Sequence, residues 1–446
     1  MTLTLFLLLT LTFVIMLLLY LNLLVSGFDV ISPNSIVCLM SIFSLGIAIF
    51  FINKVDFEIT VGAVALVLIA IISFMIPGLI VPPRHSFARD DIDNSEVYGK
   101  VVIILSCIFL VMTTFLYYRE VSKVASLSGF NSSSPMGMLY YYRTATLGNT
   151  EAIAARSKIV GQMTIASNAI SYLVIVDFVK RISFRKLRGN KFPLLIELIS
   201  IIATIVQSIL SGGRMQFLYY IEGIIFLFLF YYNKKEHKSI SPSMVRKIIL
   251  YIMLVYVAFF FLGGLTGKTS KLDFSSTLFV YAGSPIPAFS ELLSGKVSFL
   301  NTSFGSDLLF GPIQLLNMLG FDIPINQSPA PPVAVGNLTT NIYGSFGRYY
   351  GTIGVLGLVL VNFMMGALYN AWYKRVKYQN VNTELFLVIY LLLSKALFDY
   401  CIEERFFMSV LSVGTILRII YAVIFYYMFF AKFKQGRIII STKRQS

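Results

Sequence analysis

Apolar runs of about 20 residues recur along almost the whole chain, and each is long enough to cross the hydrocarbon core of a bilayer as a helix. Of the 446 residues, 57% are hydrophobic and 13% are charged, whereas an ordinary soluble domain has about a quarter of its residues charged. The first run lacks a basic leader and a small-residue cleavage site, which favours a retained helix over a signal peptide. The pattern predicts an all-α polytopic integral membrane protein, a single transmembrane domain over 1–446 with about eleven transmembrane helices: 3–25, 34–53, 58–81, 99–118, 158–179, 192–211, 215–232, 248–265, 351–373, 384–400 and 412–431.

The basic residues predict how these helices are oriented. Lys and Arg concentrate in four short segments, 180–191, 234–247, 374–377 and 432–444, which alternate correctly across the helices. The positive-inside rule therefore assigns all four to the cytoplasm. The net charge of +15 is then explained by this topology and by contact of the basic residues with anionic lipid headgroups. No nucleic-acid partner is expected.

With this orientation, the largest segment outside the cytoplasm is 266–350, a large extracytoplasmic loop between the eighth and ninth helices. Its density of proline and glycine excludes one long helix. Two stretches within it, 276–294 and 305–320, have apolar spacing typical of short helices that lie along the membrane surface. The segment 119–157 is predicted to be a second external loop, polar and aromatic.

Four ionisable residues fall in the outer half of the predicted spans: Glu222, Lys395, Asp399 and Arg418. Lys395 and Asp399 are four residues apart on one helix, so we expect them to pair directly. The group either neutralises itself between helices or lines a polar cavity that opens outward. Glu197 lies towards the cytoplasmic end and does not join this group.

The tight turn Ser211-Gly212-Gly213-Arg214 joins two predicted helices on the outer face. Its glycines let backbone N–H groups approach a ligand closely. The start of the following helix and the guanidinium of Arg214 add positive charge. These features suit a phosphate or diphosphate at the membrane surface, and the alternative is an interfacial arginine that extends to the headgroups beside a structural turn.

Three segments resemble the bacterial oligosaccharide repeat-unit polymerases of the Wzy type. Ser211-Gly212-Gly213-Arg214 is similar to that family's small-Gly-Gly-Arg turn, and Tyr281–Phe289 resembles its Tyr-x-Gly-x-Pro-Ile-x-x-Phe stretch. Asn341–Gly344, followed by the aromatic and glycine-rich run Tyr349–Gly357, resembles its Asn-x-Tyr block at the start of the next helix. The chain has Thr352-Ile353-Gly354 where the family often has Asp-Phe-Gly, so no acid is assigned there.

The resemblance implies a GT-C-like glycosyltransferase in the bacterial inner membrane, with its active site facing the periplasm or exterior. Such an enzyme joins undecaprenyl-pyrophosphate-linked oligosaccharide repeat units into O-antigen or capsular polysaccharide. Membrane lipid, a flippase and chain-length regulator proteins are its implied partners, and no cofactor is implied.

The same resemblance suggests roles for particular external residues. A departing diphosphate needs cations, and the acceptor hydroxyl needs a proton acceptor. The only two histidines, His85 and His237, are predicted to be cytoplasmic. The implied catalytic residues are the arginines Arg214, Arg348 and Arg405 for the diphosphate, with Glu291, Glu403 and Glu404 as candidate proton acceptors. The implied sugar contacts are Tyr281, Asn341 and Tyr343.

The sequence leaves alternatives to the polymerase interpretation open. Asp90-Asp91-Ile92-Asp93 contains an Asp-x-Asp pattern that binds a divalent metal in many glycosyltransferases, but the predicted topology assigns it to the cytoplasm, so we expect a metal-independent reaction. An O-antigen ligase shares the helical plan and the lipid-diphosphate donor. A lipid-linked oligosaccharide flippase or other transporter could also place charges in an outward cavity, although the paired repeats typical of transporters are not found.

Overall fold

The computed structural model describes residues 2–80, 99–130, 134–148, 156–184, 191–236, 274–299, 308–324, 330–378 and 383–431, and most of these residues are helical. Eight helices among them are long and apolar enough to cross a membrane. They are α1 (Thr2–Ser26), α2 (Pro33–Val55), α3 (Val61–Ile80), α4 (Lys100–Leu127), α7 (Lys158–Ser183), α8 (Phe192–Leu210), α9 (Arg214–Glu236) and α14 (Gly344–Tyr378). The chain is therefore a multi-pass helical membrane protein.

The remaining predicted spans are not matched by helices of full length. Two shorter apolar helices, α15 (Thr383–Leu393) and α17 (Val413–Phe425), occupy parts of the predicted spans 384–400 and 412–431; α17 continues as a π-helix, η5 (Tyr426–Ala431). The predicted span 248–265 lies outside the described residues. The number of eleven crossings thus stays a prediction.

The segment 119–157, expected to be an external loop, is helical over much of its described length, whereas its external position stays a prediction. The helix α4 continues to Leu127, and a further helix, α5 (Pro135–Gly148), packs against its end. Val121 and Val124 of α4 are buried with Leu139 and Tyr142 of α5 in one apolar cluster. A spacing of three residues places the two residues of each pair on one helix face. This apolar spacing indicates a helix, although the polar composition of the segment favoured a loop.

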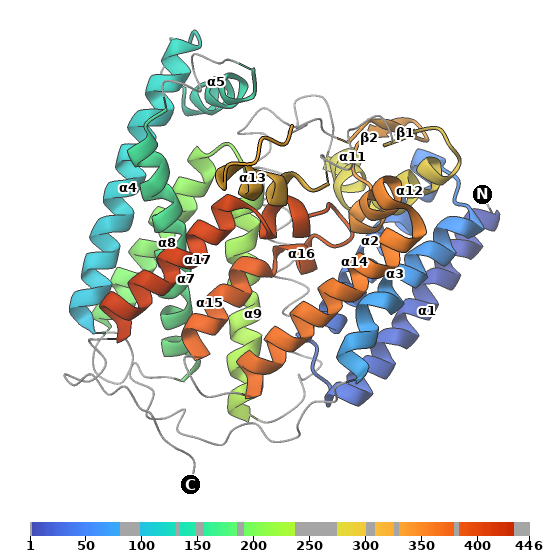
Figure 1. Ribbon diagram of the computed structural model, residues 1–446, viewed down its shortest axis with the longest axis horizontal. Helices are drawn as coiled ribbons and strands as arrows, with labels where there is room; N and C mark the ends of the chain where they lie inside the picture. The colour runs from blue at the N-terminus through green and yellow to red at the C-terminus, as the bar shows by residue number, and fades with distance from the viewer. Residues whose placement is uncertain are drawn as a thin grey trace.

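The helices form a bundle with two distinct ends (Figure 1). We call one the basic end: there α7 finishes with Lys180 and Arg181, and α14 finishes with Arg375 and Lys377. We call the other the distal end: it carries α5, the turn between α8 and α9, and the short elements of the segment 274–340. All four of these basic residues lie at one end, as the alternation of the predicted helices requires.

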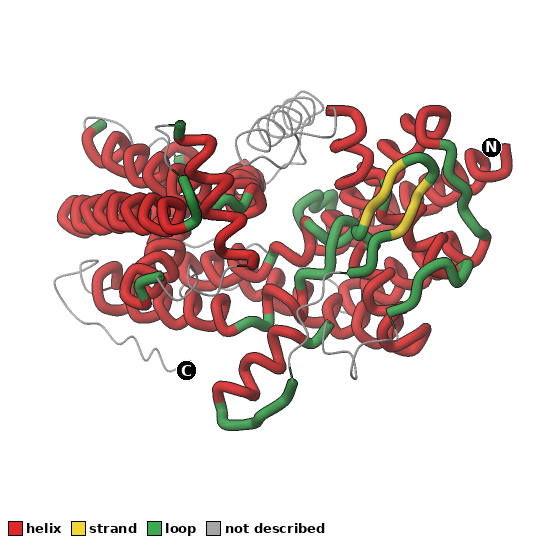
Figure 2. The backbone as a smooth tube through the Cα atoms, turned by 90° about the horizontal axis from the view of Figure 1, so that it is seen from above, coloured by secondary structure: helices red, strands yellow, loops and turns green. Residues whose placement is uncertain are grey.

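Short elements cover the distal end between α9 and α14. They are α11 (Phe274–Leu278), the π-helix η2 (Phe279–Gly283), α12 (Pro285–Leu293), α13 (Phe310–Met318) and the strands β1 (Val333–Val335) and β2 (Leu338–Thr340). The described helices match the short helices predicted in 276–294 and 305–320, but the antiparallel hairpin was not predicted. The backbone N–H of Asn337 at its tip donates to the carbonyl of Val55, the last residue of α2, at 3.2 Å. Seen from above, the hairpin lies on the same side of the bundle as the N-terminus (Figure 2).

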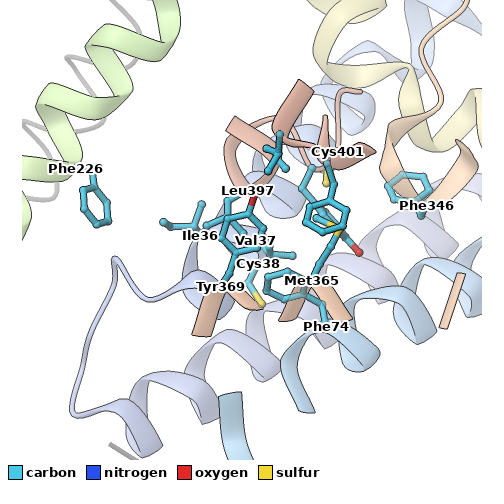
Figure 3. Packing of buried hydrophobic residues seen from close by; sticks show 14 of the residues in the cluster. Ile36, Val37, Cys38, Phe74, Phe226, Phe346, Met365, Tyr369, Leu397 and Cys401 are labelled. Atoms are coloured by element: carbon cyan, nitrogen blue, oxygen red, sulfur yellow. The ribbon is translucent and has the colours of Figure 1, made fainter. Parts of the chain in front are cut away.

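Close backbone packing joins α14 to α3. A Cβ on Gly366 would lie 2.0 Å from the carbonyl oxygen of Phe74, so only glycine fits at this crossing. Beside it, Cys38, Phe74 and Met365 gather with Tyr369 and Cys401 where α2, α3 and α14 meet the turn after α16 (Lys395–Phe398) (Figure 3). This core supports the segment that carries the candidate site.

Charges near the basic end are neutralised within the bundle. Arg181 lies 2.8 Å from both Asp177 and Glu197, and Lys180 lies 2.5 Å from Glu384. Glu197 therefore belongs to this end, as predicted. Because removing one partner of a buried pair costs about 3–5 kcal/mol, these contacts are structural supports rather than candidates for chemistry.

Candidate functional site

The chain between α15 and α17 is broken into short pieces. A single turn, α16 (Lys395–Phe398), is followed by an irregular turn, 399–405, and a π-helix, η4 (Phe406–Val410). Backbone groups away from water need protein partners. The first residues of α14 supply two of them, because the N–H of Gly344 donates to the carbonyl of Ile402 at 3.3 Å and that of Ser345 donates to Tyr400 at 3.0 Å. The 399–405 turn and the start of α14 therefore form one unit, in the distal half of the bundle (Figure 1).

Arg405 is held by two carboxylates of this turn. Its Nε lies 3.2 Å from Oδ2 of Asp399, and its Nη2 lies 2.6 Å from Oε2 of Glu403. Asp399 also accepts a hydrogen bond of 2.6 Å from the hydroxyl of Tyr219 on α9. The Arg405 side chain remains 19% exposed, so a partly accessible guanidinium is fixed between α9 and the turn.

Arg348 lies in the first turns of α14 and is almost completely buried. Its guanidinium carbon is 5.2 Å from the centroid of the Phe299 ring, and its Nη2 is 3.9 Å from the sulfur of Met408. Its Nη1 is buried and has no hydrogen-bond partner among the described residues. Arg348 thus has a fixed orientation and an unused donor.

Glu404, predicted as a proton acceptor, caps the π-helix η4 instead. Its Oε1 accepts hydrogen bonds from the N–H of Phe407 at 2.8 Å and from the hydroxyl of Tyr349 at 3.0 Å, and its Oε2 accepts from the N–H of Met408 at 3.1 Å. The residue is fully buried. Burial raises the pKa of the Glu404 carboxyl, while these hydrogen bonds oppose the rise. The carboxylate that a ligand can reach is that of Glu403, whose side chain is 42% exposed.

The glycine turn does not offer the donors expected of it. The N–H of Gly212 donates to the carbonyl of Ile209 at 3.0 Å, and the N–H of Gly213 donates to the hydroxyl of Ser211 at 3.2 Å. Both groups are therefore used within the turn. Arg214 is the first residue of α9, and its side chain lies outside the described part of the chain.

A cation that the sequence analysis did not select lies over this turn. Gly212 has a φ of +66°, and a Cβ on it would lie 3.5 Å from the Cβ of Arg143 on α5. Tyr281 of η2 lies near the same arginine. Arg143 was missed because 119–157 was read as a loop; the helical spacing of α5 was the available signal.

The other predicted residues have different surroundings. Tyr343 has 1% of its surface exposed, its hydroxyl donates to the carbonyl of Pro331 at 2.6 Å, and its ring packs on Phe299, so no face is open to a sugar. Glu291 on α12 pairs with Lys296 at 2.6 Å and has no described contact with Arg348 or Arg405. Asn341 is exposed at the distal end, and Tyr281 is half-buried. The roles of these last two as sugar contacts stay predictions.

The ionisable residues of the spans do gather, but not with the expected pairing. The direct Lys395–Asp399 pair is wrong, because Asp399 faces Arg405 and the Lys395 ammonium lies 5.2 Å from the centroid of the Tyr219 ring. Oε2 of Glu222 and Nε of Arg418 are buried and have no hydrogen-bond partner among the described residues. Buried polar atoms without hydrogen bonds are costly, so the described residues do not satisfy all the hydrogen-bonding groups of this cluster.

The described residues contain no cluster of three or more His, Cys, Asp or Glu side chains that could hold a metal ion. The Asp-x-Asp run 90–93 lies outside the described residues. No protein-family model matches the chain, and no curated protein or solved structure is significantly similar to it. The fold and the site therefore define a multi-pass helical membrane protein with two held arginines in one half of its bundle.

Proposed function

We propose that the protein is a glycosyltransferase that joins lipid-diphosphate-linked oligosaccharide repeat units into O-antigen or capsular polysaccharide. Its substrate is an oligosaccharide on undecaprenyl pyrophosphate, and the reaction takes place at the distal end, on the outer face of the bacterial inner membrane. The resemblance of 211–214, 281–289 and 341–357 to the Wzy-type polymerases motivates the choice of substrate.

The observation that carries the proposal is the unpaired donor of Arg348 close to the 399–405 turn. A buried guanidinium with a free N–H is suited to an oxyanion, because its planar donors match phosphate oxygens. Arg405 adds a second guanidinium whose Nε and Nη2 are already fixed by carboxylates. Two oriented cations in one turn region are what a departing diphosphate requires.

In the proposed reaction, a hydroxyl of the acceptor sugar attacks the anomeric carbon of the donor. The new glycosidic C–O bond forms as the bond between that carbon and the diphosphate oxygen breaks, and the bonding pair leaves with the lipid diphosphate. Glu403 accepts the hydroxyl proton, because it is the exposed carboxylate of the turn. Arg348 and Arg405 stabilise the charge that develops on the leaving diphosphate.

Substitution of the arginines tests this function in a deletion strain that carries the full chain on a plasmid. Arg348→Leu keeps most of the volume but removes the charge, and Arg348→Lys keeps the charge but loses the planar fork. We expect the first to abolish chain elongation and the second to restore it only in part, and the same order for Arg214→Ala and Arg214→Lys. Arg375→Ala, at the basic end, is the matched control and should leave chain length unchanged.

The glycans of the deletion strain distinguish the candidate classes. Loss of a polymerase leaves single repeat units attached to the surface acceptor. Loss of a flippase leaves none, and loss of a ligase leaves long chains on the lipid carrier. Normal chain lengths in the Arg348→Leu strain, with the protein present in the membrane, would remove the main support for the proposal.

A further inference from the structure

The helix α13 and the turn that follows it carry exposed apolar side chains at the distal end. Four large ones have 38%, 66%, 77% and 58% of their surface exposed: Leu316, Met318, Leu319 and Phe321. We call these four side chains the α13 tip. Asp322 is the only ionisable residue in the segment 308–324. Large apolar side chains that are exposed together mark a contact with a partner or with lipid.

The turn that carries the α13 tip is closed by its own hydrogen bonds. The N–H of Gly320, which has a φ of +98°, donates to the carbonyl of Asn317 at 3.1 Å, and that of Phe321 donates to Leu316 at 3.2 Å. The Asn317 side chain donates to the carbonyl of Ile323 at 2.8 Å and accepts from its N–H at 2.9 Å. Because these polar groups already have partners, the turn can enter an apolar environment at low cost.

The position of α13 brings its tip to the edge of the bilayer. The helix lies at about the level of the turn between α8 and α9 (Figure 1). Seen from above, α13 extends beyond the outline of the spanning helices (Figure 2). An element beside the bundle, at the height where spanning helices end, has the lipid headgroups and upper acyl chains as its neighbours.

We propose that the α13 tip inserts into the outer leaflet of the bilayer and anchors the candidate site at the lipid surface. Area argues against a protein as the occupant. The four side chains expose on the order of 450 Å², about half of the 800 Å² that each partner buries in a stable protein interface. A bilayer sets no such minimum, because each apolar side chain that enters it contributes separately.

The anchor is joined to the candidate site through η4. A Cβ on Gly311 of α13 would lie 2.2 Å from the carbonyl oxygen of Phe407 and 2.7 Å from that of Leu411, so the two backbones are in direct contact. Met408 of η4 lies 3.9 Å from Nη2 of Arg348. This part of the inference rests on the proposed function: a lipid diphosphate lies at headgroup depth, and the anchor holds Arg348 at that depth.

Tryptophan fluorescence tests insertion without requiring catalysis. The chain has a single tryptophan, Trp372, so Trp372→Phe gives a background without tryptophan emission. In this background, Leu319→Trp reports on the tip, and Ala334→Trp on the exposed hairpin is the matched control. The full-length protein is placed in nanodiscs of phosphatidylethanolamine and phosphatidylglycerol. We expect brominated phosphatidylcholine to quench Leu319→Trp and iodide to leave it unchanged, with the reverse for Ala334→Trp.

The other quenching patterns would overturn the proposal. Quenching of Leu319→Trp by iodide would show that the tip faces water. Resistance to both quenchers would assign the tip to a contact with a second copy of the chain. Because 308–324 contains no Lys or Arg, we expect the same quenching by brominated lipid in nanodiscs without phosphatidylglycerol. Loss of quenching there would refute insertion by apolar contact.

A charge at the tip tests the role of the anchor in elongation. Leu319→Glu should keep the tip out of the bilayer and shorten the glycans, whereas Leu319→Phe stays apolar and should elongate like the wild type. Ala334→Glu adds the same charge to the hairpin and is the matched control. Thermal unfolding in detergent should be equal for all three variants, because Leu319 and Ala334 are both exposed.

The results separate the anchor from the proposed function. Quenching of Leu319→Trp by brominated lipid in a protein that does not elongate glycans would support the anchor and count against the polymerase. Normal glycan lengths with a folded Leu319→Glu protein would support the polymerase and refute the role of the α13 tip in holding the candidate site.

Discussion

The hydroxyl of Tyr219 donates a 2.6 Å hydrogen bond to Asp399, and Asp399 holds Arg405 at 3.2 Å. Through these contacts α9, which begins at Arg214, is joined to the turn that carries Arg405 and Glu403. Removing the hydroxyl should therefore free Arg405 to change its orientation, although no charge is lost.

We expect Tyr219→Phe to lower stability by about 2 kcal/mol, because hydrogen bonds to charged groups are worth more than neutral ones. Glycan elongation should also fall. Tyr390→Phe is the matched control, since the Tyr390 hydroxyl is buried without a partner among the described residues and its removal should cost nothing. Thermal unfolding in detergent and glycan length measure both effects, and equal behaviour of the two variants would contradict the assigned role of Tyr219.

Substitution of Glu403 and substitution of the adjacent Glu404 should have different effects. Glu403→Gln removes the exposed carboxylate, so we expect elongation to fall about 100-fold with the fold intact. Glu404→Gln disturbs a cap with three accepted hydrogen bonds and should lower the free energy of unfolding by about 1–3 kcal/mol. Rate assays with purified protein and unfolding curves measure the two effects, and a fully active Glu403→Gln enzyme would exclude Glu403 as the base.

The stability of the protein should depend on pH through Glu404. Burial raises the pKa of this carboxyl above its ordinary value of 4.5. As the pH rises above that value, the unfolded chain releases its proton first, so the folded state binds more protons and the free energy of unfolding falls. The melting temperature of the wild type should therefore decrease relative to that of Glu404→Gln as the pH rises from 4.5 towards neutral. If the difference in melting temperature between the wild type and Glu404→Gln stayed constant over this pH range, the raised pKa of Glu404 would be refuted.

Cysteine labelling in intact cells tests the orientation. Ala334 is exposed on the distal hairpin, and Lys191 is exposed just before α8 at the basic end. A membrane-impermeant maleimide should modify Ala334→Cys and spare Lys191→Cys until the cells are opened. The three native cysteines are buried and should not contribute. The reverse pattern would place the candidate site in the cytoplasm and exclude the proposed function.

Elongation should not require a divalent metal. A lipid diphosphate is already a good leaving group, and fixed arginines supply the charge that stabilises its departure. Purified protein should therefore extend lipid-linked repeat units in excess EDTA, and the double variant Asp91→Asn, Asp93→Asn should stay active. Activity that disappears with EDTA and returns with magnesium would replace the arginine model with a metal-assisted one.

Sequence reasoning predicted the short distal helices because proline positions and apolar spacing act locally. It did not predict the hairpin, whose tip is held by the end of α2, 282 residues before Asn337. It also read 384–400 as one span, since hydropathy does not reveal that Gly344 and Ser345 of α14 satisfy the backbone of a broken helix there. Such partners lie far away in the sequence and leave no local signal.

The sequence by itself determined that this protein is a multi-pass helical bundle, because the length and apolarity that a bilayer requires are properties of each segment alone. The sequence also identified Arg348 and Arg405 as candidate residues for binding the diphosphate. Only the tertiary structure decided that Asp399 faces Arg405 instead of Lys395, that Glu404 is a cap while Glu403 is exposed, and that Arg143 covers the glycine turn. The physical reason is distance along the chain: Tyr219 and Asp399 are 180 residues apart, and their contact depends on how whole helices pack.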